Sequence, residues 1–170
     1  MKWLKKFEHW TTDSTFGNFD FDNQMQYVSN SKIYYGIHEI YLRRDGKGVK
    51  VKAKFDTGAR TSSIDFSVAK KLGISDRLIE KCKELENVHV PKNITKSEQK
   101  ELERSLSKEL KNEFPEVTSV QASKSSSGFS VRAYIKVDIE YSGQIISTEV
   151  NLRDRSGLTC EMLVGLRDML

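Results

Sequence analysis

The sequence is poor in the residues that bind metals and form disulfides. It has two cysteines, Cys82 and Cys160, far apart in the chain, and three histidines. There is no Cys-x-x-Cys, no His-Glu-x-x-His and no His/Cys group with the spacing of a zinc site. We therefore expect neither a metal ion nor a cofactor. The few cysteines fit a reducing compartment, which predicts a cytoplasmic protein.

Long apolar runs and a concentrated charge of one sign are also missing. No stretch approaches the roughly 20 apolar residues of a membrane-spanning helix. No apolar segment follows the basic start at residues 2–6, as it would in a secretory signal. The net charge is +4, with acidic and basic residues interleaved through most of the chain. Nucleic-acid binding calls for a concentrated basic face, so we expect neither a membrane nor a nucleic acid as partner.

Residues 1–32 are predicted to be an N-terminal extension to a domain at residues 33–170. The extension is too aromatic for a plain linker. It either packs on the domain or anchors a partner, including a second copy of the chain. Its aromatic residues stand among polar ones with no sustained period: Trp3, Phe7, Trp10, Phe16, Phe19, Phe21 and Tyr27.

The domain begins with patterns typical of β-strands. Residues 33–42 are rich in isoleucine and tyrosine, and Arg44-Asp45-Gly46-Lys47 carries an Asp-Gly hairpin signal. In residues 49–55 apolar side chains alternate with lysines, which places the apolar set on one face of a strand. This strand runs directly into Asp56-Thr57-Gly58.

The end of the chain has the same character. Residues 131–139 alternate strictly between apolar side chains and more polar ones, Ser142-Gly143 predicts a turn, and residues 146–152 form the returning strand. Residues 160–164 are a last short apolar run before a helical-looking segment at 166–170. Together with the first part, these patterns predict a mainly β domain.

A helical insert is predicted at about residues 65–117, between the two β regions. Residues 67–72 form a short helix, Ser75 caps a second one, and Thr95 with Glu98 makes a capping box for a third. The second and third helices each carry apolar side chains on one face: Leu78, Ile79, Cys82 and Leu85, then Leu102, Leu106, Leu110 and Phe114.

The chemistry of the sequence is concentrated in Asp56, Thr57 and Gly58, the predicted catalytic residues. An aspartic protease needs a carboxylate at the end of a strand, turned sharply into a cleft. Gly58 permits the tight turn, and the Thr57 hydroxyl can bond across to a partner loop. The same tripeptide also forms ordinary turns, so the preceding apolar strand is what favours the catalytic interpretation.

The chain contains one Asp-Thr-Gly, whereas water attack on a peptide bond in this mechanism needs two carboxylates that share a proton. The sequence therefore predicts an Asp56 dyad formed in a homodimer. Ala59 and Arg60, which follow the dyad loop, and Ser127 and Gly128 are predicted to contact a peptide or protein substrate. The last two lie in a flexible polar tract that is either a flap tip or an ordinary loop.

Residues 36–64 and 125–170 resemble the retropepsin-like aspartic protease family, whose members are often labelled ATP-dependent zinc proteases and occur beside ATP-grasp ligases. The resemblance implies the small closed β-barrel of the acid proteases and peptide-bond hydrolysis at Asp56. The zinc in that label has no ligand set in this sequence. The motifs that carry the resemblance are Gly36-Ile37-His38-Glu39-Ile40-Tyr41-Leu42, Lys52-Ala53-Lys54-Phe55-Asp56-Thr57-Gly58-Ala59-Arg60-Thr61-Ser62, Asp154-Arg155-Ser156 and Leu163-Val164-Gly165.

Two alternatives remain open at this point. Retropepsins usually continue into a C-terminal strand that joins two subunits, and no such strand follows Leu170, so residues 1–32 are expected to supply the dimer contact. If they do not, the protein is a non-catalytic structural or assembly protein with the same fold, possibly phage-encoded and then virion-associated. Asp154 is a candidate for a second carboxylate within one chain. Arg60, Asp154 and Arg155 are also candidates for plain surface or ion-pair residues.

Overall fold

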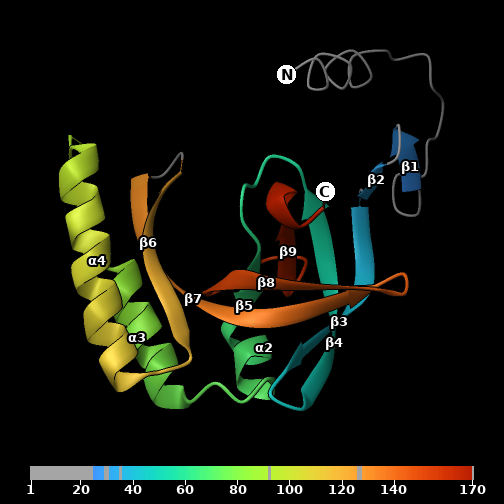
Figure 1. Ribbon diagram of the computed structural model, residues 1–170, viewed down its shortest axis with the longest axis horizontal. Coiled ribbons are helices and arrows are strands. Elements are labelled where there is room, and N and C mark those ends of the chain that lie inside the picture. Colours follow the sequence, from blue (N-terminus) through green and yellow to red (C-terminus); the bar gives the residue numbers. More distant parts are fainter. Residues whose placement is uncertain (1–24, 29–30, 35, 92, 126–127, 170) are drawn as a thin grey trace.

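The computed structural model describes residues 25–28, 31–34, 36–91, 93–125 and 128–169 (Figure 1). Most of the predicted N-terminal extension lies outside these residues. Its last part forms a two-stranded antiparallel sheet, β1 (Met25–Val28) with β2 (Ser31–Tyr34), which the sequence analysis did not anticipate. The role of residues 1–32 stays a prediction.

The predicted closed β-barrel is confirmed. The barrel strands follow in the order β3-β4-β9-β5-β8-β7, and a further pairing between β3 and β7 closes the circle. Strand β6 lies outside this circle and pairs with β7 alone. The strands are β3 (Gly36–Arg44), β4 (Lys47–Asp56), β5 (Ser63–Asp65), β6 (Val117–Ser125), β7 (Gly128–Tyr141), β8 (Gln144–Arg153) and β9 (Met162–Gly165).

Strand β7 is long enough to pair with β6 outside the barrel and with barrel strands inside it. Its first half pairs with β6, and its second half enters the barrel between β8 and β3. The β6–β7 hairpin therefore stands out from the barrel, beside helix α4 (Figure 1). Of the polar tract at 123–128, Ser123–Ser125 end β6 and Gly128 begins β7, so these four residues belong to strands, while residues 126 and 127 lie outside the described residues. Cross-strand backbone bonds hold polar residues in a ladder as well as apolar ones.

Both predicted tight turns are present. Asp45 and Gly46 link β3 to β4 with φ values of 48° and 76°, and Ser142 and Gly143 link β7 to β8 with 50° and 75°. Positive φ at both central residues is the geometry that matches the twist of a two-residue hairpin. These turns fix the register of the strands that reach the site.

The helical insert is also confirmed. It consists of α2 (Phe66–Lys71), α3 (Asp76–Glu86) and α4 (Lys96–Glu113). Ser75 caps α3, and Thr95 with Glu98 forms the predicted capping box of α4. The helical-looking end of the chain is shorter than predicted, a 3₁₀ turn called η1 (Leu166–Asp168). Within the described part of the chain, no helix is long and apolar enough to cross a membrane.

The alternating strands and the helices share one core. The apolar set of β7 is almost fully buried, as the alternation predicts, and Leu110 and Phe114 of the α4 segment join it. Tyr134 is the exception, because it belongs to the other face of β7 and is nevertheless 0% exposed. Its surroundings belong to the candidate site. The buried apolar residues of β7 are Val131, Ala133, Ile135, Val137 and Ile139.

Candidate active site

Asp56 is the last residue of β4, where that strand runs parallel to β9. In this register Asp56 lies beside Gly165, and Phe55 beside Val164. The alternation of β4 buries Phe55 in the barrel and turns Asp56 to the opposite face, where it is partly exposed. The strand therefore presents a single carboxylate at the end of the barrel.

The loop after Asp56 folds back on that carboxylate. The Gly58 amide donates to Asp56 Oδ1 at 2.9 Å, and the Ala59 amide donates to the Asp56 carbonyl at 3.1 Å. A Cβ atom on Gly58 would lie 3.1 Å from Asp56 Oδ1. Glycine at this position thus lets the backbone amide approach the carboxylate. Thr57, Gly58 and Arg60 are exposed, and Ala59 is half-buried.

The C-terminal segment holds the loop from the other side. The amide of Leu166 donates to the Ala59 carbonyl at 2.8 Å, and that of Arg167 to the Arg60 carbonyl at 3.3 Å. A Cβ atom on Gly165 would lie only 2.5 Å from the carbonyl carbon of Thr61. Gly165 is therefore the residue that allows β9 and the Asp56 loop to cross in contact.

Ser62, which is 0% exposed, joins the loop to Asp168. Its Oγ accepts from the Gly165 amide at 3.0 Å and donates to Asp168 Oδ2 at 2.5 Å. The Asn151 backbone amide and side-chain Nδ2 both donate to the Ser62 carbonyl, at 3.0 and 2.8 Å. Strands β8 and β9 thus fix the same loop residue.

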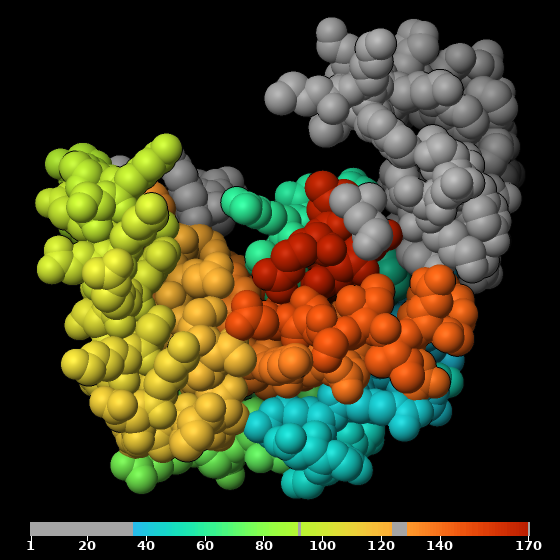
Figure 2. Space-filling model, in the orientation of Figure 1, coloured from blue at the N-terminus to red at the C-terminus, as the bar shows by residue number. Residues whose placement is uncertain are grey.

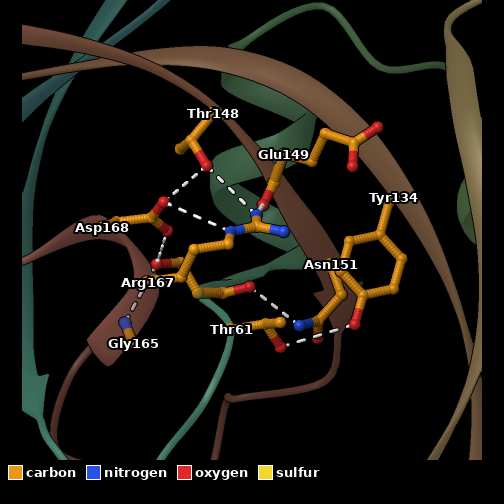
Figure 3. Close-up of polar contacts among 9 residues, drawn as sticks. Thr61, Tyr134, Thr148, Glu149, Asn151, Gly165, Arg167 and Asp168 are labelled. Atoms are coloured by element: carbon orange, nitrogen blue, oxygen red, sulfur yellow. Dashed lines mark hydrogen bonds and ion pairs between the residues drawn. The ribbon is translucent and has the colours of Figure 1, made fainter.

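The Asp168 carboxylate is 3% exposed, and its charge is compensated by several groups (Figure 3). Besides Ser62, Thr148 Oγ1 donates to Asp168 Oδ1 at 2.6 Å, and Arg167 Nε lies 3.5 Å from the same oxygen. Arg167 Nη2 also donates to Thr148 Oγ1 at 3.1 Å and to the Glu149 carbonyl at 2.6 Å. Such donors offset the free-energy cost of burying a carboxylate inside the protein.

Sequence reasoning missed this polar network. Ser62, Thr148 and Asp168 come from three distant parts of the chain, and Thr148 was assigned only to a strand. The one available signal was the charged pair Arg167-Asp168, one residue beyond the apolar-apolar-Gly element.

A hollow separates the Asp56 loop from the β6–β7 hairpin. In the space-filling view the loop and the C-terminal residues stand on one side of it, and β6 with α4 stands on the other (Figure 2). Of the predicted substrate-binding residues, Ala59 and Arg60 lie on the loop side. Gly128 begins β7 opposite Ser125, near the hairpin end. Ser127 lies outside the described residues.

One family model matches most of the chain. Residues 34–170 match the RimB-like family, described as retropepsin-like aspartic endopeptidase RimB. The chain belongs to the RimB-like family. Among solved structures, it is similar to the protein Lpg0085 of unknown function (DUF785) from Legionella pneumophila, with 15% identity and a TM-score of 0.39. That likeness covers 82% of this chain and 87% of the Legionella chain. No curated protein matches.

Asp154 of this RimB-like chain does not lie near Asp56. Strand β9 is parallel to β4, β5 is antiparallel to β9, and β8 is parallel to β5. Strand β8 therefore runs opposite to β4, and Asp154, directly after β8, lies toward the other end of the barrel from Asp56. Hydrogen bonds from Ser156 hold its carboxylate and lower the pKa of Asp154. The idea of Asp154 as a second carboxylate within one chain is wrong.

Arg155, the next residue along the chain, has a structural role. It is 6% exposed. Its guanidinium donates to Ser63 Oγ at 3.0 Å and to the Cys160 carbonyl at 3.2 Å. Its amide donates to Asp65 Oδ2 at 2.7 Å, and the Ser67 amide donates to Asp65 Oδ1 at 2.8 Å. Burial raises the pKa of Asp65, but hydrogen bonds from the Ser67 side chain and from the Ser67 and Arg155 amides outweigh burial and leave the pKa lowered.

In the part of the RimB-like chain that the structure covers, no three His, Cys, Asp or Glu residues are grouped so as to hold a metal ion. Cys82 and Cys160 are both buried, and burial raises the pKa of the Cys82 thiol to about 12. Cys82 is therefore unsuited to act as a nucleophile.

Proposed function

We propose that the protein is an aspartic endopeptidase that hydrolyses peptide bonds at a dyad of Asp56 carboxylates from two copies of the chain. The observation that carries this proposal is the position of Asp56, a partly exposed carboxylate at the end of a barrel strand. Its Oδ1 accepts a hydrogen bond from the Gly58 amide at 2.9 Å, and Gly165 packs against the same loop. Membership of the RimB-like family supports it.

In the proposed reaction the two Asp56 carboxylates share one proton, because two carboxylates in hydrogen-bond contact cannot both be ionised. The ionised carboxylate takes a proton from water, and the water oxygen bonds to the peptide carbonyl carbon. The protonated carboxylate gives its proton to the carbonyl oxygen. The C–N bond of the tetrahedral intermediate then breaks, the leaving amine takes the proton that the first carboxylate received from water, and a hydroxyl proton of the intermediate passes to the other carboxylate, which restores the dyad. Ala59, Arg60, Ser127 and Gly128 are the proposed substrate contacts.

The second carboxylate is proposed to come from another copy, because the described part of one chain offers no good candidate. Asp168 already has both oxygens engaged by Ser62 and Thr148, and Asp154 is at the other end of the barrel. A two-fold axis beside Asp56 would bring the same loop of each copy together. Residues 1–32 are proposed to supply the remaining contact, and a cytoplasmic location is proposed from the cysteine content.

The test compares the wild-type chain with Asp56→Asn on a library of peptides, with products identified by mass spectrometry. Asn has nearly the shape of Asp but cannot share the proton or act as base, so cleavage should fall by at least about 10²-fold. The wild-type activity should resist chelators and be inhibited by pepstatin. Asp154→Asn serves as the matched control and should retain activity.

Two results would contradict the proposal. One is undiminished cleavage by a folded Asp56→Asn variant. The other is a folded wild-type chain that cleaves no peptide in the library at any concentration or pH, which would favour a non-catalytic assembly protein.

A further inference from the structure

Tyr134 departs from the pattern of its own strand. Its side chain is on the face of β7 that carries Arg132 and Lys136, opposite to the apolar core set, yet it is 0% exposed. It pairs with Ser119 of β6 on one side and with Asn151 of β8 on the other. Tyr134 is thus at the point where β7 leaves the protruding hairpin and enters the barrel.

The side chain of Tyr134 reaches the Asp56 loop. Its hydroxyl lies 3.4 Å from Thr61 Oγ1, in a pair where either oxygen can donate (Figure 3). Its strand neighbour Asn151 donates twice to the carbonyl of Ser62. The Tyr134–Asn151 pair therefore contacts two consecutive residues of the loop that begins at Asp56.

The backbone of Tyr134 is fixed from the hairpin side. Thr118 Oγ1 donates to the Tyr134 carbonyl at 3.1 Å. Thr118 is the extra residue of a β-bulge, since the register between β6 and β7 shifts between Val117 and Ser119. A bulge bends a strand and redirects its side chains. One residue thus connects the base of the hairpin to the loop that carries Asp56.

We propose that Tyr134 is a positioning residue that ties the β6–β7 hairpin to the Asp56 loop through its hydroxyl and Thr61. Its catalytic consequence rests on the proposed peptidase function, because the loop it holds is the one that presents Asp56. A packing role for the ring alone predicts that phenylalanine replaces Tyr134 without effect. A positioning role predicts a loosened loop in Tyr134→Phe.

The first experiment does not depend on activity. Amide hydrogen exchange of residues 57–62 is compared in the full-length wild type, Tyr134→Phe, Thr61→Val and the double variant. A neutral hydrogen bond corresponds to roughly a 2- to 10-fold change in an opening equilibrium. Each single variant should therefore speed exchange of the loop by that factor, and the double variant should be no faster than either one.

A matched control is available on the same strand. The Tyr141 hydroxyl bonds His38 Nδ1 at 2.8 Å rather than Thr61, and its ring packs against Phe55. Tyr141→Phe also removes one phenol hydroxyl from β7, and it should leave exchange of the loop unchanged. The proposal would be overturned if residues 57–62 of Tyr134→Phe exchanged at the wild-type rate. It would also be overturned if the rate increases of the two single variants multiplied in the double variant.

The second experiment uses a peptide that the wild type cleaves and Asp56→Asn does not. Tyr134→Phe should lower kcat by roughly 2- to 10-fold and change KM by less than about 2-fold, because the loop presents the catalytic group in the bound state. Thr61→Ser keeps the hydroxyl and should retain the activity that Thr61→Val loses.

The two failures are distinguishable. If no peptide is cleaved, the proposed peptidase function fails, and loop exchange alone decides the role of Tyr134. If the wild type cleaves through Asp56 but Tyr134→Phe matches it in kcat and in exchange of the loop, only the positioning role is wrong.

Discussion

At Gly165 the surrounding backbone leaves no room for a side chain. An added Cβ atom would lie between 2.5 and 2.8 Å from three backbone atoms of Thr61. Neither segment can move freely, because Leu166 is bonded to Ala59 and the Gly165 amide to Ser62. The sequence marked Leu163-Val164-Gly165 as part of a motif, but the reason for its glycine is visible only where β9 crosses the loop.

Gly165→Ala should therefore destabilise the fold by about 1–3 kcal/mol, the usual cost of overpacking a close contact. Peptide cleavage should fall with it, since the loop at Asp56 is displaced. Gly157→Ala is the matched control, because nothing lies within 4 Å of a Cβ atom at Gly157. Urea unfolding of the two variants measures the difference, and equal stability would contradict the crossing contact.

At the scale of elements, α2 and the β8–β9 connection are held together by Asp65. One oxygen of its carboxylate caps α2 through the Ser67 amide, and the other accepts from the Arg155 amide. The sequence predicted the helix but not this cap, because the Arg155 contact spans 90 residues. Local propensity signals a helix end, whereas a cap shared with a distant loop depends on the fold.

The lowered pKa of Asp65 gives this element a pH dependence. Because the folded pKa lies below the unfolded one, the ionised carboxylate stabilises the fold above the unfolded pKa, near 4. The contribution is lost as pH falls through the folded pKa. The stability difference between wild type and Asp65→Asn should thus shrink below about pH 4, as measured by urea unfolding from pH 7 to 3. A difference that stays constant over this range would contradict the role of the carboxylate.

At the scale of the whole molecule, the barrel brings one Asp-Thr-Gly loop to its end and leaves the dyad incomplete. The hollow between that loop and the β6–β7 hairpin is open on the face shown in Figure 2. A peptide lying there would contact both walls. Because the proposed mechanism needs two such carboxylates and one chain supplies one, the proposed enzyme is active only as a pair of chains.

Cleavage should accordingly rise more than linearly with protein concentration in the range where the chains associate. Deleting residues 1–32 should give folded but inactive monomers, as judged by analytical ultracentrifugation and circular dichroism. The Asp56→Asn full-length chain is the control, because it should be inactive and still dimeric. A monomeric wild type with full activity would refute the dyad between two copies.

The sequence by itself determined the parts of this protein that depend on neighbouring residues. Strand alternation, the Asp-Gly and Ser-Gly turns, the caps at Ser75 and Thr95, and Asp56 at a strand end all follow from local backbone and side-chain preferences. These features were enough to predict a mainly β domain, its helical insert and the candidate carboxylate, and the family resemblance implied the barrel. The matched family agrees with them.

The tertiary structure alone decided which distant residues support that carboxylate. The contact between Thr61 and Tyr134 spans 73 residues, and that between Ser62 and Asp168 spans 106. It also placed Asp154 toward the far end of the barrel and put Ser123–Ser125 and Gly128 into paired strands. Strand order and direction set these relations, and a period of two along one strand carries no information about which strand lies beside it.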